Sequence, residues 1–342
     1  MNILKVLLSP LSIIYWMITS IRNIAFNLGL LKQYKSKTPV ISVGNLSMGG
    51  TGKTPHVSYL TSLLSNYKVA IISRGYGRKR KDLIIADSKI HSTRDIGDEP
   101  MELLAKFEGD NFTMVVDGDR VKAIKRIEKE HAETQVIILD DGFQHRYVKR
   151  NLNLLLTDYN QLFYNDFIIP FGTLREPRKG VKRADAILVT KCRSFIDSKE
   201  RAKIRTKLSK YSNSPVYFSK IGYEGFKNEK NKTINHNDSY LVVTGIAKPA
   251  PIFKYLKEQS IKFDSITFGD HHNFSTKEIK QIAKKSNLYK GIITTEKDWM
   301  RLKETKLKEL CSVEIFRLQI GIHFLEDKDK LAFEKQINRL LK

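Results

Sequence analysis

The sequence is poor in cysteine and has almost no long hydrophobic runs. Its 342 residues include two cysteines, Cys192 and Cys311, which lie far apart along the chain. Two such thiols are too few for a disulfide framework or a zinc site, and this scarcity is typical of a reducing cytosol. With 41% hydrophobic and 28% charged residues, the composition excludes a largely disordered chain and a polytopic membrane protein.

Acidic residues are also in short supply. The chain has 37 Asp and Glu against 60 Lys and Arg, which gives a formal net charge of +23. Such a surface attracts polyanions, whether nucleic acid, anionic lipid head groups or phosphorylated substrates. The sign of the charge alone does not choose among these partners.

One uncharged stretch, from Val6 to Ile21, stands out at the amino terminus. It is shorter than the roughly 20 residues of a membrane span and contains Pro10. No small-residue cleavage site of a signal peptide follows it. Tyr15 and Trp16 are typical of the water–lipid boundary, and apolar residues recur at helical spacing: Leu8, Leu11, Ile14 and Ile18. We expect a helix in the membrane interface, held also by anionic lipids; the alternative is a helix packed on the core.

The rest of the chain alternates short apolar runs with helical stretches, the pattern of an α/β fold with a parallel sheet flanked by helices. At roughly 100–200 residues per domain, the length favours two domains. We expect a membrane-interface helix over residues 1–38, a core over 39–212, a smaller α/β domain over 213–325 and a carboxyl-terminal helix over 326–342. Residues 224–238, rich in Asn and Lys, are expected to form a loop or a poorly ordered hairpin.

The expected core strands are Val40–Val43, Val69–Ser73, Thr113–Asp117, Val136–Asp140, Leu152–Thr157 and Ala186–Thr190. Helices are expected after Lys53, around Met101–Phe107 and over Arg120–His131. In the smaller domain, strands are expected near Val216, Tyr240–Thr244, Ser265–Phe268 and Gly291–Thr294, with helices near Pro251–Glu258 and Thr276–Lys285.

A glycine-rich loop follows the first core strand and leads into a helix, the context of a P-loop. Its backbone would cradle phosphates, Lys53 would reach the β- and γ-phosphates, and the Thr54 hydroxyl would hold Mg²⁺. The loop residues are Gly49, Gly50, Thr51 and Gly52. The pattern G-x-x-x-x-G-K-[ST] is met except at Ser47, where it asks for glycine. The alternative is a turn that merely joins strand to helix.

Two acids, Asp140 and Asp141, end the apolar run that starts at Val136. This is the position of the second carboxylate that a P-loop site uses to bind Mg²⁺. One of the two could instead cap a turn before Gly142.

Residues 190–193, Thr-Lys-Cys-Arg, resemble the [NT]-K-x-D element that binds guanine in GTPases. Arg193 stands where the base-reading Asp should be. The sequence therefore disfavours guanine, and we expect ATP.

Seven ordered segments resemble one family, the tetraacyldisaccharide 4′-kinases of lipid A synthesis, which phosphorylate an acylated glucosamine disaccharide. The segments are Val43-Gly44-Asn45 through Gly52-Lys53-Thr54-Pro55, Ser73-Arg74-Gly75-Tyr76-Gly77, Gly97-Asp98-Glu99-Pro100, Asp140-Asp141-Gly142-Phe143-Gln144-His145, Leu174-Arg175-Glu176, Asp270-His271-His272 and Thr295-Glu296-Lys297-Asp298. The resemblance implies a P-loop NTPase core, a second smaller α/β domain and an amino-terminal membrane-associated helix. It also implies a monotopic kinase on the cytoplasmic face of the bacterial inner membrane, and we expect a monomer.

The same resemblance implies roles for individual residues. Asp98 would be the catalytic base and His271 its partner. A further set would line the cleft or bind the substrate's 1-phosphate: Gln144, Arg175, Glu176 and Arg120. Without the family, Asp98 indicates only a helix start and His271 a surface histidine. The segment Thr295–Asp298 receives no physical role.

Three other functions compete with this one. A P-loop kinase or ATPase for another lipid or small molecule would need Lys53, Thr54 and Asp140 but not the Asp98 and His271 segments. A nucleic-acid-binding NTPase would suit the positive charge, but no nucleic-acid module is recognisable, so nucleic acid is not expected as a partner. A membrane scaffold would leave the P-loop without purpose.

Overall fold

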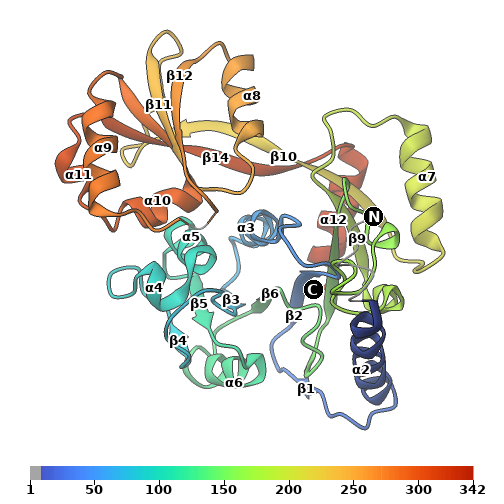
Figure 1. Cartoon of the computed structure of the whole chain (residues 1–342). Coiled ribbons are helices and arrows are strands. Elements are labelled where there is room, and N and C mark those ends of the chain that lie inside the picture. Colours follow the sequence, from blue (N-terminus) through green and yellow to red (C-terminus); the bar gives the residue numbers. More distant parts are fainter. Residues whose placement is uncertain (1–8, 271, 342) are drawn as a thin grey trace.

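The computed structural model describes residues 9–270 and 272–341. They form a mixed α/β fold around a 12-stranded sheet with the order β12-β11-β13-β14-β10-β9-β8-β2-β6-β3-β5-β4. Figure 1 shows two lobes. We call residues 28–215 the larger lobe and residues 228–313 the smaller lobe.

The larger lobe contains the parallel part of the sheet. Its strands are β2 (Val40–Asn45), β3 (Val69–Ser73), β5 (Phe112–Val116), β6 (Val136–Asp140), β8 (Leu152–Asp158) and β9 (Ala186–Thr190), and the short β4 (Ile84–Ile85) adds an antiparallel edge. Every residue of β2 is buried, because helices cover both faces of a parallel sheet. A separate two-stranded sheet pairs β1 (Tyr34–Lys35) with β7 (Val148–Lys149).

Helices on the two faces bury apolar stripes against this sheet. They are α3 (Lys53–Leu63), α4 (Thr93–Ile96), α5 (Asp98–Phe107), α6 (Arg120–Glu130) and α7 (Ser198–Ser209). Val57 and Leu60 of α3 join one core cluster, and Ile124 and Ile127 of α6 join another. Because the strands run parallel, their carboxyl ends meet at one edge of the sheet, where open α/β sheets bind ligands.

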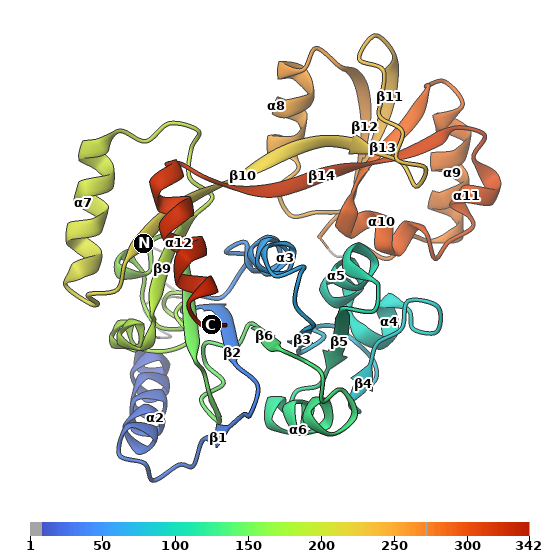
Figure 2. The same ribbon diagram turned by 180° about the vertical axis from the view of Figure 1, so that it is seen from behind.

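The smaller lobe repeats the α/β pattern. Its parallel strands are β11 (Ser239–Thr244), β12 (Lys262–Thr267) and β13 (Gly291–Thr295), and its helices are α8 (Ala250–Glu258), α9 (Thr276–Ser286), α10 (Glu296–Leu302) and α11 (Leu307–Leu310). In Figures 1 and 2, α10 lies on the side that faces α5.

Two long antiparallel strands, β10 (Val216–Lys227) and β14 (Glu314–Phe324), join the lobes. The start of β10 pairs with β9, and β14 pairs with β13, so one sheet runs through both lobes. The chain then returns through α12 (Asp327–Asn338), which lies against the larger lobe in Figure 2. Phe333 and Ile337 of α12 join its core, and the Tyr59 hydroxyl donates to Glu334 (2.6 Å).

The first described helix, α2 (Ser9–Asn27), lies along the larger lobe. Its Ser12 and Tyr15 hydroxyls donate to the carbonyls of Ile168 and Arg175 (3.2 and 3.1 Å). Apolar side chains are exposed along it: Leu11, Ile13, Ile14, Trp16, Met17, Ile18, Ile21 and Ile24. In the described parts of the chain, each helix is either too short or too polar to span a bilayer.

The expected core strands are confirmed to within two residues at their ends, and three of them match the observed bounds. The loop expected over residues 224–238 is partly wrong, because β10 continues to Lys227 and the irregular segment begins after it. The sequence reasoning missed α7, α10 and β14. The expected carboxyl-terminal helix is α12, four residues shorter at its end.

Candidate active site

The glycine-rich loop joins β2 to α3, and its backbone requires glycine at two positions. Gly49 has φ 103° and Gly52 has φ 84°, both in the left-handed region. Gly52 precedes α3, and no side chain of the described residues caps that helix. The first backbone N–H groups of α3 are therefore available to an anion such as a phosphate.

Neighbouring segments hold this loop in place. The Met48 N–H donates to the Thr173 carbonyl (2.7 Å), and the Thr190 hydroxyl donates to the Thr51 carbonyl (2.8 Å). Lys191 donates to the Gly50 carbonyl and forms an ion pair with Asp158 (3.2 Å). The lysine of the Thr-Lys-Cys-Arg run thus supports the loop, a contact that the sequence reasoning missed.

Lys53, Asp141 and Arg175 converge beside the loop. The Lys53 Nζ lies 3.8 Å from Asp141 Oδ1. Arg175 donates both terminal nitrogens to the same carboxylate, at 2.9 and 2.8 Å. Burial acts to raise the pKa of Asp141, but the Arg175 hydrogen bonds and the Lys53 charge outweigh it, so the pKa lies below its usual range. Asp141 is therefore ionised near neutral pH.

Asp140, at the end of β6, lies in a different environment. Its Oδ2 accepts from the Ser73 hydroxyl (2.9 Å), whereas its buried Oδ1 finds no hydrogen-bond partner in the described residues. Burial, followed by the charges of Glu99 and Asp141, raises the pKa of Asp140 to about 7. A buried carboxylate oxygen without a partner fits a cation as its ligand.

The described residues contain no cluster of three or more His, Cys, Asp or Glu side chains that could hold a metal. This does not conflict with a magnesium site, because Mg²⁺ in phosphate sites takes one or two protein ligands and completes its shell with water and phosphate oxygens. Thr54 lies at the start of α3, and Asp140 ends β6 with Asp141 next to it; their role as magnesium ligands stays a prediction.

Gln144 and Glu176 continue the site toward α2. The Gln144 amide donates to the Asn45 carbonyl (2.6 Å) and to Glu176 (3.1 Å). Glu176 also accepts two bonds from Arg183 (2.7 Å each) and one from Asn23 of α2 (2.9 Å). These contacts connect α2, the helix that carries the exposed apolar residues, to the loops beside Lys53.

The structure places Arg120 beside Asp140, at the edge of the site. Its guanidinium is buried and donates to the carbonyls of Asp117, Gly118 and Asp140 (3.1–3.3 Å). Arg120 thereby fixes the sheet edge at Asp140. Its expected contact with the substrate's 1-phosphate stays a prediction.

Asp98 begins α5 and faces the smaller lobe, where its carboxylate pairs with Arg301 of α10 (3.2 Å). His271, the other predicted member of the catalytic pair, lies outside the described residues.

Asn45 is a residue that the sequence reasoning missed as part of the site. It is fully buried at the end of β2; its side chain accepts from Arg175, and its backbone carbonyl accepts from Gln144. Its place in the Val-Gly-Asn segment was a signal that could have identified it.

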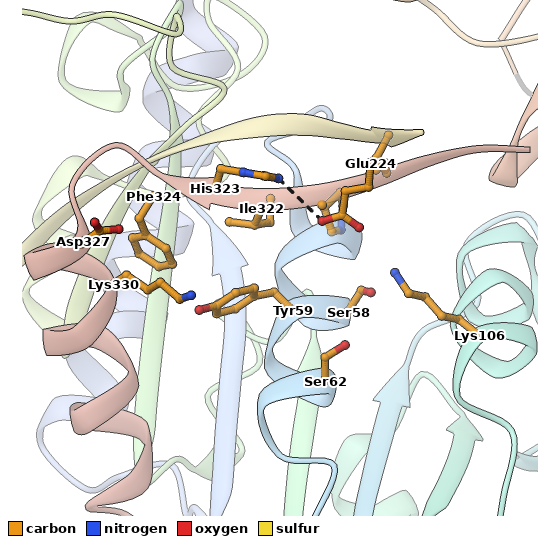
Figure 3. Close-up of a pocket in the computed structure, with 13 residues that line it drawn as sticks. Ser58, Tyr59, Ser62, Lys106, Glu224, Ile322, His323, Phe324, Asp327 and Lys330 are labelled. Atoms are coloured by element: carbon orange, nitrogen blue, oxygen red, sulfur yellow. Dashed lines mark ion pairs between the residues drawn. The ribbon is translucent and has the colours of Figure 1, made fainter. Parts of the chain in front are cut away.

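A separate pocket of about 410 Å³ lies along α3 where the lobes join. Figure 3 shows Tyr59 and Ser62 of α3, Lys330 of α12 and the ion pair between His323 and Glu224 (3.6 Å) around it. None of the predicted site residues lines this pocket.

A parallel sheet with a glycine loop, a lysine and two carboxylates at its carboxyl edge defines the class of P-loop nucleotide-binding proteins. The particular family follows from sequence comparison. The family model described as LpxK, Tetraacyldisaccharide-1-P 4'-kinase, matches residues 4–342, so the chain belongs to this family of kinases.

Individual relatives agree with this assignment. The chain is 43% identical to Tetraacyldisaccharide 4'-kinase of Flavobacterium johnsoniae over 90% of both chains, and 43% identical to that of Flavobacterium psychrophilum over 98% of this chain and 97% of the relative. The crystal structure of LpxK from Aquifex aeolicus in complex with ATP is 30% identical, covers 99% of this chain and 100% of that chain, and superposes with a TM-score of 0.77.

Proposed function

We propose that this chain transfers the γ-phosphoryl group of ATP to the 4′-hydroxyl of tetraacyldisaccharide 1-phosphate, giving lipid IVA in lipid A synthesis. The observation that carries the proposal is the family match over residues 4–342. The site agrees with it, because Lys53, Asp141 and Arg175 lie together beside a glycine loop. The rival, a kinase for a different lipid or small molecule, is not favoured, since the named relatives cover nearly the whole chain.

ATP would bind at the start of α3. Gly49, Gly50, Thr51 and Gly52 would present backbone N–H groups to its phosphates, and Lys53 would neutralise the charge that develops during transfer. Support comes from the Aquifex aeolicus structure, which contains ATP. Thr54, Asp140 and Asp141 would hold Mg²⁺, which would supply charge neutralisation at the phosphates during transfer.

Asp98 would accept the proton of the 4′-hydroxyl while the hydroxyl oxygen attacks the γ-phosphorus and ADP leaves. His271 would orient this carboxylate and share the proton. Gln144, Arg175 and Glu176 would line the same site, and Arg120 would contribute to the binding of the 1-phosphate. Asp98 opens α5 where this helix packs on the smaller lobe, so we propose that the two lobes act as separate domains around the substrate.

The α2 helix would lie in the interface of the inner membrane, on its cytoplasmic face. Its hydroxyl and amide groups at Ser12, Tyr15 and Asn23 bond to the larger lobe, whereas Ile18 and Ile21 are 59% and 66% exposed. An apolar face turned away from the protein suits the boundary between head groups and acyl chains. The two free cysteines agree with a reducing compartment, and we propose a monomer.

An incubation of the purified full chain with labelled ATP, Mg²⁺ and tetraacyl disaccharide 1-phosphate in detergent tests the function. Label should enter the lipid, and mass spectrometry should place it at the 4′ position. Label confined to released phosphate would identify an ATPase and refute the proposal.

A further inference from the structure

The segment Thr295–Asp298 builds the start of α10. The Thr295 hydroxyl caps this helix by accepting from the Asp298 N–H (3.0 Å) and donates to the Asp298 carboxylate (2.8 Å). Asp298 is fully buried and also accepts from the Thr244 hydroxyl and the Gly245 N–H at the end of β11 (3.0 Å each). The first turn of α10 is therefore fixed to the sheet of the smaller lobe.

Arg301 lies one turn further along α10 and is 6% exposed. It donates to the His272 carbonyl (3.0 Å) and lies 3.8 Å from Asp298 Oδ1. Across the junction between the lobes, it pairs with Asp98 Oδ2 at 3.2 Å. The contact with Asp98 is an ion pair, because Arg301 Nη2 has no hydrogen-bond partner among the described residues. A buried guanidinium is costly unless it is paired, so the two carboxylates offset the burial of Arg301.

A second contact joins the segment just after α10 to α4, the helix that precedes α5. Glu304, just after α10, accepts from the Thr93 N–H (2.7 Å) and the Thr93 hydroxyl (2.9 Å) at the start of α4. The α10 helix is thus held to the larger lobe at two points, and Arg301 is the point that reaches the predicted base.

We propose that Arg301 is a positioning residue for phosphoryl transfer. It holds the Asp98 carboxylate of the larger lobe against the smaller-lobe backbone at His272, the residue next in sequence to the predicted partner His271. The Thr295–Asp298 segment fixes the first turn of α10 and so sets the position of Arg301 on the next turn. This inference rests on the proposed function, because it takes Asp98 as the base.

The test is a double-mutant cycle with Asp98→Asn, Arg301→Gln and the combination, assayed by label transfer to lipid. A positioning role predicts that Arg301→Gln lowers kcat by about 10–100-fold, the usual cost of a misplaced catalytic group. ATP affinity should stay within about threefold, since Arg301 acts only through Asp98. For the same reason the double variant should be no more than about threefold worse than Asp98→Asn alone.

Arg201→Gln is the matched control. Arg201 lies in α7 and pairs with Glu326 at 3.0 Å, and Figure 1 shows α7 well apart from α5, the helix that Asp98 begins. It should lower the melting temperature without lowering kcat. Should Arg301→Gln not fold, Arg301→Lys takes its place in the cycle, because it keeps the charge while losing the fork that reaches His272 and Asp98 together.

Two results would overturn the inference. In one, the losses from Asp98→Asn and Arg301→Gln multiply in the double variant, which makes Arg301 independent of Asp98. In the other, Arg301→Gln lowers the melting temperature but leaves kcat unchanged. Failure of the proposed function shows differently, as no label transfer by the unmodified chain or as full activity in Asp98→Asn.

Discussion

Arg175 and Asp141 form a two-pronged ion pair, with Nη1 2.9 Å from Oδ2 and Nη2 2.8 Å from Oδ1. Asp141 takes φ 50°, an unusual conformation for a residue other than glycine. The same carboxylate lies 3.8 Å from the Lys53 Nζ. Arg175 therefore sets the orientation of an acid that in turn faces the P-loop lysine.

Arg175→Lys should lower kcat by about 10–100-fold with the fold intact. A lysine keeps the charge but cannot make two parallel bonds, so Asp141 would lose its fixed orientation. Steady-state label transfer measures the effect. Arg205→Lys, which alters a pair with Asp329 (3.1 Å) outside the site, should leave kcat unchanged. Equal kcat values for the two variants would show that Arg175 has no role in phosphoryl transfer.

Lys53→Ala should lower phosphoryl transfer by at least about 100-fold, because it removes the charge that would face the γ-phosphate. Circular dichroism should show an intact fold, since the substitution removes only the ion pair between Lys53 and Asp141 (3.8 Å). Lys122→Ala, which removes a mostly exposed lysine paired with Asp117 (3.6 Å), serves as the control. Activity of Lys53→Ala at the control level would mean that phosphate binds elsewhere.

The parallel strands of the larger lobe were predictable because short-range rules decide them. Buried parallel strands such as β2 and β6 are mostly apolar runs, and β6 ends at an acid, so both of its ends were predicted from that pattern. β14 was missed for the opposite reason. Its burial alternates irregularly, and it passes between the lobes, so its two ends have different neighbours.

The site was less predictable than the fold. Lys53 and Asp141 follow from local motifs, but the Arg175 fork depends on a contact between residues 34 positions apart. Arg120 shows the limit of residue type as a guide, because its guanidinium bonds to backbone carbonyls of its own sheet edge. These contacts depend on the folded sheet edge, so no local pattern in the sequence could have predicted them, and the expected contact with a phosphate stays a prediction.

The exposed apolar side chains of α2 should determine membrane binding. The triple variant Ile14→Asn, Ile18→Asn, Ile21→Asn keeps the Ser12 and Tyr15 contacts with the larger lobe, which deletion of residues 1–21 would remove. An isoleucine side chain transferred fully from water contributes about 1.5–3 kcal/mol, so partitioning onto phosphatidylglycerol-containing vesicles should fall at least about 100-fold.

Vesicle cosedimentation measures this change. Leu331→Asn, at a 65% exposed leucine of α12, is the control and should partition like the unmodified chain. Unchanged sedimentation of the triple variant would show that the membrane contact lies on another surface.

Asp98→Ala and His271→Ala should each lower kcat by about 10²–10⁴-fold, the usual contribution of general acid–base catalysis. Binding of ATP should change little, as measured by calorimetry. If the two residues act as one proton-accepting unit, the double variant should be scarcely slower than the slower single variant. Losses that multiply would make them independent contributors, and a raised KM with normal kcat would assign that residue to substrate binding.

His56 should make the fold sensitive to acid. It is 4% exposed in α3, and its Nδ1 lies 2.7 Å from the Gly52 carbonyl. A carbonyl only accepts, so Nδ1 carries the hydrogen, and Nε2 accepts from the Ser219 hydroxyl (3.1 Å). Burial lowers the pKa of His56 from 6.5 to about 4, although the Gly52 hydrogen bond opposes the shift.

The sign of the pH dependence follows from these two pKa values. Between pH 6.5 and about 4 the unfolded chain binds a proton at this histidine and the folded chain does not, so stability falls as the pH falls through this window. At pH 5 the loss of stability amounts to about 2 kcal/mol relative to neutral pH.

Urea unfolding at pH 7.5 and 5 should show this loss in the unmodified chain and a correspondingly smaller one in His56→Gln. Other titrating groups contribute equally to both proteins, so the difference isolates His56. Parallel pH dependences would mean that His56 accepts its proton in the folded state as readily as in the unfolded chain.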